Sequence, residues 1–553
     1  MNPITHLIVG FVTALVTLTQ LVAKPNVLLI LTDNQAYHEL GCHGHETLQT
    51  PHIDQLASES VDFTNFHAPN YCSPSRGVLM SGKYALRSGI HNTIGGVSLL
   101  HMSDTTLADH LKEAGYRTAI FGKWHLGMSY PHQPQERGFE HSFIHGGGGI
   151  GQLEDYFGNS HMNATYWQNK VPYKSTGFST DVLFSKAQDF IAEESQRPFF
   201  CFISTPATHK PWEPHPQVAE RIKKRLGKTK DLSLLSMIEN IDDNVGAILE
   251  QLDQQQILDE TLVIFLTDQG IHNRGAPQND TNNPPSHLAD MGHHVFCMMR
   301  YPKVISRPHR NNALTGMIDI VPTVLDLCGI TPPPMMDGRS LKPLLGGLST
   351  WSDDRELIIQ CPRKRERIKW DNSTVKTQRW RLVNGEKLYD VTTNSKECSQ
   401  YFPEVLQRLR SSYEAFWNSL PPTEDVLSRH LIGSTPTELC AMDWYQGATP
   451  WRWPKKVTNP VQAQGTWAVE VTEAGTYMFE LRAFPREAEK TFQATSATLN
   501  IGDLQVTKAL DGTIQHTILQ MDLTPGKYDL SSSFQNGKKQ FGAMFVYINK
   551  IPR

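Results

Sequence analysis

Short apolar runs that end in polar residues recur along the first half of the chain. The first is "NVLLILTDN" at 26–34, and runs of the same form lie at 117–125, 198–205, 261–270 and 295–300. A continuous apolar run of this length is typical of a strand that is buried on both faces of a sheet. The pattern therefore predicts a largely parallel sheet with both faces covered.

Helical periodicity fills the segments between these runs. Residues 103–115 place their apolar positions on one side, with Ser103 as the expected N-cap and Gly115 as the stop. Residues 231–254 form a longer amphipathic stretch. Strands that alternate with helices predict an α/β fold, in which ligands bind beyond the carboxyl ends of the strands.

The alternation of apolar runs with helical segments ends at about residue 350. Residues 378–391 predict a hairpin and residues 401–420 predict a helix, after which "PPTED" breaks the chain. We therefore expect a main α/β domain over 24–350 and a small α+β subdomain over 351–425.

Alternation with a period of two dominates from about residue 460, as in Trp467, Val469 and Val471. It predicts a linker and an all-β, sandwich-like module over 426–553. Three tryptophans precede the alternating part and either form a stacking platform or belong to a core: Trp444, Trp451 and Trp453. Further strands are expected near 496–510, 515–523, 526–534 and 542–550, with turns at the "DG" of 511–512 and the "PG" of 525–526.

The N-terminus carries an uncharged apolar run, "THLIVGFVTALVTLTQLVA" at 5–23. It predicts a signal peptide over 1–23 that is cleaved near Ala23, and hence a periplasmic or secreted protein. The alternative is an uncleaved membrane anchor, because the run is nearly long enough to span a bilayer.

Charge and cysteine content exclude several classes of protein. The formal net charge of −4 over 553 residues gives no reason to expect nucleic acid or an anionic membrane surface as a partner. The eight cysteines are scattered without a CxxC pair, which excludes zinc ribbons and small disulfide scaffolds. Cys201 and Cys297 lie in apolar runs and are expected in the core. The sequence carries no signal for an oligomeric state.

Two of the apolar runs end in an acid followed by an amide, Asp33-Asn34 and Asp268-Gln269. Carboxylate and amide oxygens are the ligands that hard divalent cations prefer. A single such pair is more often a turn or a helix cap. Two pairs at two strand ends favour a cation site.

Basic side chains follow other strands. Lys123 and His125 lie two residues apart after the run at 117–125, so in an extended segment they point the same way. Together they suit anion binding and proton transfer. His209 follows the run at 198–205 in the same manner. The alternative is a surface lysine with two ordinary hydrogen-bonded histidines.

Cys72 stands in "NYCSPSRGVLMSG" at 70–82, two residues before Pro74 and four before Arg76. The order of the motifs Asp-Asn, C-S-P-S-R, G-K-W-H-L-G, T-H-K-P-W and T-D-Q-G resembles the formylglycine-dependent type I sulfatases of the alkaline phosphatase superfamily. Cys-x-Pro-x-Arg followed by Leu-Met-x-Gly is similar to that family's maturation signal. The resemblance covers about 25–420 and implies an alkaline-phosphatase-like α/β fold.

The resemblance implies a sulfuric ester hydrolase that acts on a sulfated carbohydrate or an aryl sulfate. Cys72 is then a precursor, which a maturation enzyme oxidises to formylglycine, and a hydroxyl of the aldehyde hydrate is the nucleophile. The resemblance also implies a Ca²⁺ ion, which is bound by Asp33, Asn34, Asp268, Gln269 and the residue at 72. Arg76 is implied to stabilise the hydrate, and His125 to transfer a proton. Lys123 and His209 are implied to bind the sulfate.

The chain departs from the family pattern in several places. The first metal motif commonly reads Asp-Asp in the family and here reads Asp33-Asn34, which removes one negative charge from the cation site. The second commonly reads Asp-Asn or Asp-His and here reads Asp268-Gln269, which keeps a side-chain oxygen. A second sulfate-binding lysine is missing near residue 285, and His287 is the candidate replacement for it. The polar insert at 272–290 is expected to form a loop over the site.

Two alternatives to an active sulfatase remain. One is a phosphodiester or phosphonate ester hydrolase of the same superfamily, since a lost lysine disfavours the more highly charged phosphate monoesters. The other is a degenerate homologue that only binds glycans through its β module. The intact Cys72, Arg76, Lys123, His125 and His209 argue against the second alternative.

Overall fold

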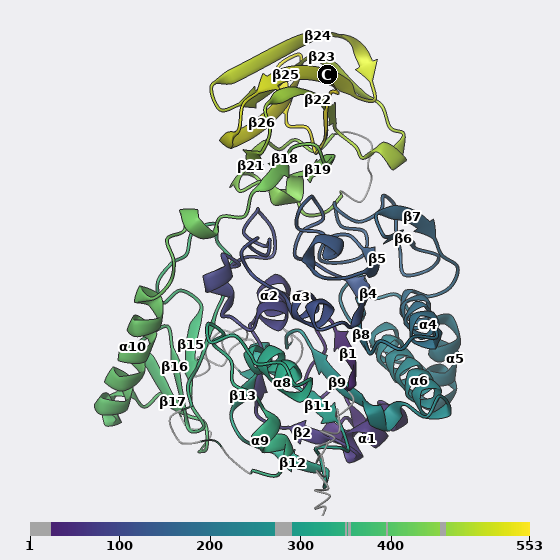
Figure 1. Cartoon of the computed structure of the whole chain (residues 1–553), viewed down its shortest axis with the longest axis vertical. Coiled ribbons are helices and arrows are strands. Elements are labelled where there is room, and N and C mark those ends of the chain that lie inside the picture. The colour runs from purple at the N-terminus through teal and green to yellow at the C-terminus, as the bar shows by residue number, and fades with distance from the viewer. Residues whose placement is uncertain are drawn as a thin grey trace, which may run out of the picture.

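The computed structural model describes residues 24–270, 290–348, 351, 355–393, 396–453 and 460–552. Figure 1 shows an α/β body with a small subdomain at one side of it and a β body stacked on top. The predicted signal peptide at 1–23 lies outside the described residues. Within them, no helix combines the length and the apolar composition that crossing a membrane requires.

A ten-stranded sheet forms the centre of the α/β body. Its strand order is β12-β2-β11-β9-β1-β8-β4-β5-β6-β7. The five central strands, β9 to β5 in this order, run parallel, whereas β11, β6 and β7 pair antiparallel with their neighbours. The strands are β1 (Asn26–Thr32), β2 (Val61–Phe63), β4 (Arg117–Lys123), β5 (His141–His145), β6 (Thr165–Gln168), β7 (Val171–Lys174), β8 (Phe199–Ser204), β9 (Thr261–Thr267), β11 (Cys297–Arg300) and β12 (His309–Asn311).

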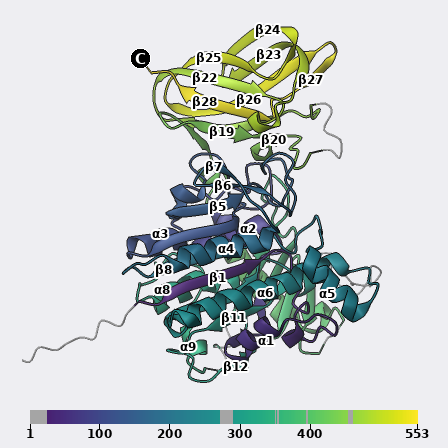
Figure 2. The same cartoon turned by 90° about the vertical axis from the view of Figure 1, so that its right-hand side faces the viewer.

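Both faces of this sheet are covered, as the unbroken apolar runs predict. Leu29 and Leu31 of β1 pack into one core, and Leu28 and Ile30 into the other. Figure 2 shows helices on the two sides of the strands. The first core is covered by α2 (Cys72–Ser81), α3 (Leu107–Glu113) and α8 (Ile320–Leu327), and the second by α1 (Pro51–Ser58), α4 (Ser179–Ala192) and α6 (Leu232–Gln254).

Helix α3 begins later than its sequence pattern predicts. Ser103 is not the N-cap. Thr106 fills that position, because its Oγ1 accepts a hydrogen bond from the backbone N–H of Asp109 at 3.0 Å. Asp109 in turn accepts from the N–H of Thr106 at 2.9 Å, which completes a capping box. The reciprocal pair satisfies two helix-end donors, and a lone serine further upstream has no such partner.

We expect Thr106→Ala to lower the free energy of unfolding by about 1–2 kcal/mol, since it removes the cap of α3. Ser103→Ala is the matched control and is expected to change it by less than about 0.5 kcal/mol. Urea unfolding of the two variants measures both values. Equal losses would contradict the assignment of Thr106 as the N-cap.

The subdomain that follows the α/β body is the predicted α+β unit. Its antiparallel sheet has the order β14-β15-β16-β17. The hairpin predicted over 378–391 is β16 with β17, and the helix predicted over 401–420 is α10 (Pro403–Asn418), which buries Leu409 and Phe416. The four strands are β14 (Leu357–Gln360), β15 (Ser373–Lys376), β16 (Trp380–Val383) and β17 (Lys387–Asp390).

The β body, called the β module below, consists of two sheets that share one core, as the alternation predicts. The "PG" turn is confirmed between β25 and β26, but Asp511-Gly512 lies inside β24 and is not a turn. The chain turns instead at Gly502, whose φ of 56° suits glycine. The strands are β18 (His430–Ile432), β19 (Thr437–Cys440), β20 (Gln446–Gly447), β21 (Gly465–Val471), β22 (Gly475–Arg482), β23 (Phe492–Ile501), β24 (Leu504–Ile514), β25 (Thr517–Leu523), β26 (Gly526–Asn536), β27 (Lys539–Phe541) and β28 (Phe545–Lys550).

The three tryptophans before the alternating strands have different environments. Trp444 is fully buried in the module core, where it contacts Trp467 edge to face. Trp453 is partly buried and stacks against Phe484. Trp451 is 43% exposed and is therefore the one tryptophan of the three that is available to a ligand.

The β module packs directly onto two loops of the α/β body. Leu153 belongs to the core of the module, and its N–H donates to the carbonyl of Trp451 at 3.2 Å. The N–H of Gly95 donates to the carbonyl of Met442 at 2.7 Å. The module therefore restrains the loops around residues 95 and 153.

The cysteines follow the sequence expectation. All eight are free thiols, and Cys201 and Cys297 are fully buried in the two cores. No disulfide therefore contributes to the stability of this chain.

Candidate active site

The predicted site residues meet at the carboxyl ends of the central strands. Asp33 directly follows β1, Asp268 follows β9, and Lys123 is the last residue of β4. Cys72 opens α2, which packs against one face of the sheet, and Arg76 of the same helix pairs with Asp268. Neighbouring parallel strands bring side chains that are up to 235 positions apart in the sequence into one cluster.

Backbone hydrogen bonds fix the Asp33-Asn34 turn. The N–H of Asp33 donates to the carbonyl of Ala207 at 2.9 Å, and the N–H of Thr208 donates to the carbonyl of Asp33 at 2.8 Å. Asn34 has a φ of 61°, a left-handed conformation that asparagine tolerates better than most residues. The segment after β8 thus holds the acid–amide pair after β1 in place.

Two buried ion pairs form the floor of the site. Lys123 Nζ lies 2.6 Å from Asp33 Oδ2, and both side chains are fully buried. Arg76 donates to Asp268 Oδ2 from Nη2 at 2.9 Å and from Nε at 3.1 Å. Its Nη1 donates to Ser204 Oγ at 2.6 Å. Each buried charge therefore has a partner of opposite sign, as burial requires.

Two oxygens of the acid–amide pairs lack a hydrogen-bond partner. Asp33 Oδ1 and Gln269 Oε1 are both buried and unpaired. Asn34 contributes to the same group, since its Oδ1 accepts from the Gln269 amide and its N–H donates to Asp268 Oδ1 at 3.1 Å. Buried oxygens without a donor are the groups that a hard cation satisfies. These four residues therefore fit a divalent cation.

The candidate cation site has fewer charged ligands than most metal sites in proteins. Among the described residues, no three His, Cys, Asp or Glu side chains converge in a way that could hold a metal ion. The site has two carboxylates, and its other two ligand candidates are amides. Its affinity for a divalent cation is therefore expected to be lower than that of a site with four carboxylates.

Cys72 has the environment of an unreactive thiol. It is buried as the first residue of α2, and this burial raises the pKa of its thiol, an effect that the nearby Lys123 only partly opposes. A raised pKa keeps the sulfur protonated, and the thiol is a much weaker nucleophile than the thiolate. Cys72 as encoded is therefore poorly suited to attack a substrate directly.

The two site histidines are neutral bases. Burial and the charge of Lys123 lower the pKa of His125 well below its usual range, and they lower the pKa of His209 to about 4. His125 Nε2 donates to the carbonyl of Thr93 at 3.0 Å, which leaves its buried Nδ1 as an acceptor without a partner. His209 Nδ1 donates to the carbonyl of Lys210 at 2.6 Å, which leaves Nε2 free. Both rings are therefore neutral at pH 7, and each takes up a proton only when a bound anion or a reacting group raises its pKa.

A glycine loop covers both histidines and was missed at the sequence level. It follows β5 as "HGGGGIGQLED" at 145–155. A Cβ on Gly148 would lie 2.4 Å from Cε1 of His125, and a Cβ on Gly149 would lie 2.7 Å from Nδ1 of His209. The backbone therefore touches the two rings where no side chain fits. The run of four glycines was the signal that could have indicated this close approach.

We expect Gly148→Ala and Gly149→Ala each to lower kcat/KM of the reaction at this site by about 10–100-fold, because displacement of a reacting group by about 1 Å has effects of this size. Gly346→Ala is the matched control, since its Cβ would meet nothing closer than 3.4 Å. Steady-state kinetics with circular dichroism as a folding check measures the effect. Full activity in both loop variants would contradict the close contact.

The predicted anion donor His287 lies outside the described residues, as does the insert at 272–289. The structure therefore brings together nine of the ten predicted site residues. These are Asp33, Asn34, Cys72, Arg76, Lys123, His125, His209, Asp268 and Gln269.

Comparisons with known proteins identify the family of this chain. Residues 25–330 match the Sulfatase family, and residues 288–408 match the family "N-sulphoglucosamine sulphohydrolase, C-terminal". N-acetylgalactosamine-6-sulfatase of Canis lupus familiaris is 29% identical over 450 residues, which cover 73% of this chain and 84% of the relative. The family match spans more than half of the chain.

Solved structures show the same fold. The structure of Ps i-CgsB in complex with k-i-k-neocarrahexaose aligns with a TM-score of 0.64 at 23% identity, and it covers 73% of this chain and 96% of that one. A protein in complex with its substrate D-glucosamine-2-N,6-O-disulfate aligns with a TM-score of 0.57 at 19% identity, covering 73% and 98%. With its alkaline-phosphatase-like fold, this chain belongs to the sulfatase family, the type I sulfuric ester hydrolases of the alkaline phosphatase superfamily.

Proposed function

We propose that this sulfatase releases sulfate from a sulfated carbohydrate, with a formylglycine made from Cys72 as its nucleophile and Ca²⁺ as its cofactor. The observation that carries the proposal is the buried thiol of Cys72, whose surroundings include Lys123 and two acid–amide pairs. A thiol in this environment has no chemistry of its own, but it lies where a nucleophile is needed.

Ca²⁺ would be held by Asp33, Asn34, Asp268 and Gln269. The unpaired Asp33 Oδ1 and Gln269 Oε1 support this assignment, because both oxygens are buried without a donor. When bound, the ion supplies positive charge that lowers the pKa of a hydroxyl group and orients it. Asn34 and Gln269 contribute oxygens without adding negative charge.

Formylglycine at position 72 would supply, as its hydrate, a hydroxyl nucleophile that a thiol does not offer. Its formation requires a maturation enzyme as a partner, and Pro74 and Arg76 belong to the recognised motif. Arg76 then holds the hydrate in place, since its guanidinium is buried next to the start of α2 and is fixed by Asp268 and Ser204.

Lys123 and the two histidines would act on the sulfate group. The positive charge of the Lys123 ammonium acts on Cys72 and would stabilise the negative charge of the sulfate. His125 Nδ1, an unpaired acceptor, takes the proton during release of sulfate. His209 would bind the sulfate and help the leaving oxygen depart through Nε2, which has to be protonated first because the ring is neutral.

The substrate class is proposed from the relatives that act on sugars, since an arylsulfatase and a steryl-sulfatase are also among the similar proteins. An N-acetylgalactosamine-6-sulfatase and two structures with a carrageenan oligosaccharide and a glucosamine disulfate are among the similar proteins. All three names refer to carbohydrates. We therefore favour a sulfated sugar over an aryl sulfate as the physiological substrate, and export through the predicted signal peptide at 1–23 would bring the enzyme to extracellular glycans.

Sulfate release tests the proposed function. The full chain is produced together with a formylglycine-generating enzyme and assayed on tetrasaccharides of carrageenan, heparin and chondroitin sulfate, on 4-methylumbelliferyl sulfate, and on phosphodiester and phosphonate esters. We expect release of sulfate and a strong preference for sulfate over phosphorus esters. A preparation with converted residue 72 that hydrolyses only phosphorus esters, or no substrate at all, would refute the proposal.

A further inference from the structure

An exposed arginine stacks on the residue that precedes Cys72. The Arg363 guanidinium lies 4.7 Å from the ring centroid of Tyr71. Its neighbour Lys364 pairs with Asp371 at 2.9 Å, but the described part of the chain places no carboxylate at ion-pair distance from Arg363. Arg363 therefore carries an uncompensated positive charge at the start of the active-site helix.

A second pair of this kind comes from the segment that leads into the β module. The Arg452 guanidinium lies 4.6 Å from the centroid of the exposed Trp451 ring. Within the described residues, Arg452 also has no carboxylate partner. Arg452 forms a β-bridge with Gln152 of the glycine loop.

Gln152 connects this second pair to the catalytic histidines. The Gln152 side chain packs close to the backbone of the glycine loop: its Oε1 and Nε2 lie 3.1 Å and 3.2 Å from the points where a Cβ of Gly148 and of Gly149 would be. His125 and His209 lie even closer to these two points, so Gln152 and the two histidines pack against the same two glycines. The Trp451–Arg452 pair is thus attached, through one residue, to the loop that covers the site.

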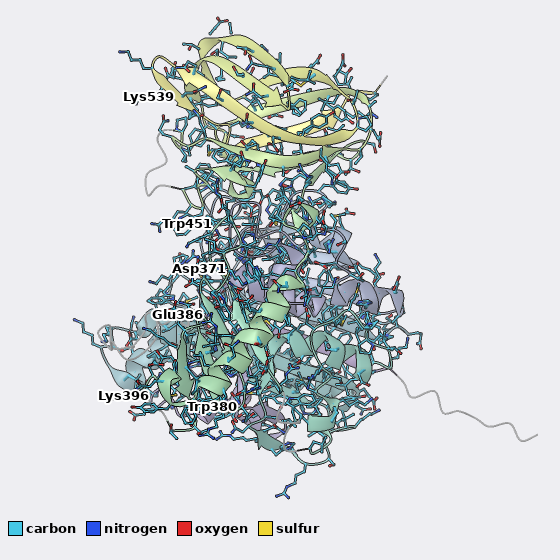
Figure 3. The ribbon with its side chains drawn as sticks, turned by 90° about the vertical axis from the view of Figure 1, so that its left-hand side faces the viewer. Asp371, Trp380, Glu386, Lys396, Trp451 and Lys539 are labelled. Atoms are coloured by element: carbon cyan, nitrogen blue, oxygen red, sulfur yellow. The ribbon has the colours of Figure 1, made fainter. Side chains whose placement is uncertain are left out.

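The two pairs lie on one connected surface. Arg365, two residues after Arg363, donates to Thr449 Oγ1 at 3.1 Å and to the carbonyl of Gly447, so its loop touches the segment that carries Trp451. Figure 3 shows Trp451 where the β module meets the rest of the chain, with Asp371, the partner of Lys364, below it on the same side.

We propose that Tyr71–Arg363 and Trp451–Arg452 are subsites for anionic sugar units that flank the unit whose sulfate is removed. The inference rests on the proposed function of the site. An aromatic ring packs against the C–H face of a sugar, and a guanidinium binds a sulfate or carboxylate group through two parallel hydrogen bonds. Each pair offers both contacts at once.

The charge distribution favours an anionic occupant over a neutral one. The charges at the floor of the site cancel, because Lys123 pairs with Asp33 and Arg76 pairs with Asp268. The cations at the rim, Arg363 and Arg452, are not neutralised in this way. A substrate with several sulfate or uronate groups therefore gains contacts at the rim that a singly sulfated molecule lacks, and one of these contacts is supplied by the segment that enters the β module.

The test compares a large and a small substrate in the same variants. For each variant, kcat/KM for the best tetrasaccharide is divided by kcat/KM for 4-methylumbelliferyl sulfate. We expect Arg363→Ala and Arg452→Ala each to lower this ratio by about 10–100-fold, the size of a lost bidentate ionic contact. Lys186→Ala is the matched control, because it removes a similar cation–aromatic pair elsewhere in the fold. The Lys186 ammonium lies 5.1 Å from the ring centroid of Tyr173, which belongs to the edge strand β7. Lys186→Ala is expected to leave the ratio unchanged.

A binding measurement separates this inference from the proposed function. Calorimetry with the full-length Cys72→Ala protein measures tetrasaccharide affinity without any turnover, and adding Arg363→Ala or Arg452→Ala should weaken it about tenfold or more. An unchanged affinity, an unchanged ratio, or an equal fall for both substrates would overturn the subsites. Failure of the wild-type chain to hydrolyse any sulfate ester would instead refute the proposed function.

Discussion

Cys72→Ala and Cys72→Ser are each expected to lower sulfate release by about 10⁴-fold or more, the usual consequence of removing a covalent nucleophile. The serine variant is the more informative one. It keeps a hydroxyl of similar size at the start of α2, but a serine has one hydroxyl on Cβ and offers an aldehyde hydrate only if it is itself oxidised. The mass of the peptide around residue 72 must therefore show that the serine is intact. Sulfate release measured by ion chromatography, on full-length protein with unchanged circular dichroism, gives the result.

Cys361→Ser is the matched control for this prediction. Cys361 is also a buried free thiol near the site, and its Sγ donates to the carbonyl of His91 at 3.2 Å. It lies outside the maturation motif, so its replacement is expected to leave activity within about threefold, in keeping with a modest local change. A Cys72→Ser variant with a tenth of wild-type activity, or an equal loss in both cysteine variants, would contradict the assignment of Cys72.

Asp268→Ala is expected to lower kcat/KM by about 10³-fold and to lower the free energy of unfolding by about 3–5 kcal/mol. Two causes act together. The change removes a candidate Ca²⁺ ligand, and it leaves the Arg76 guanidinium buried without its partner carboxylate. It also removes the acceptor for the Asn34 N–H. Kinetics and urea unfolding measure the two losses separately.

Asp268→Asn separates the two causes. The amide keeps an acceptor oxygen and the volume of the side chain but removes the charge, so we expect a smaller loss of stability and a large loss of activity that excess Ca²⁺ partly restores. Stability that is unchanged in the alanine variant would contradict the buried Arg76–Asp268 pair. Activity that does not respond to Ca²⁺ or to a chelator in any variant would contradict the cation site.

The strand ends were predictable because a simple physical rule places them. Asp33, Lys123 and Asp268 follow apolar runs, and the carboxyl ends of parallel buried strands meet at one edge of a sheet. The ion pairs between these ends were not predictable, because Lys123 pairs with an aspartate 90 positions away and strand order decides which residues meet.

The elements that the sequence pattern missed share a cause. The run of four glycines in the glycine loop indicates a close backbone approach, but it does not indicate that His125 and His209 are the side chains approached. Asp511-Gly512 resembles a turn locally, but Gly512 pairs with Ala494 of β23, and the dipeptide lies at a register shift within the β23–β24 pair. In each case a tertiary contact overrides or replaces the local signal.

The relation of the β module to the site is the largest addition that the structure makes. Periodicity predicts two sheets at the end of the chain but carries no information about what they touch. The module contacts Gly95 and Leu153, and the loops that contain them hold His125 and cover His209. The β module therefore contacts the loops that line the candidate active site, although it follows the α/β domain in the sequence.

The mass of the proteolytic peptide that contains residue 72, taken from a preparation that releases sulfate, tests the central claim most directly. A formylglycine made from Cys72 changes the peptide by the loss of one sulfur and two hydrogens and the gain of one oxygen. We predict that this species is present and that the rate of sulfate release rises in proportion to its fraction. An active preparation in which every copy of Cys72 is still a cysteine would contradict the proposed nucleophile.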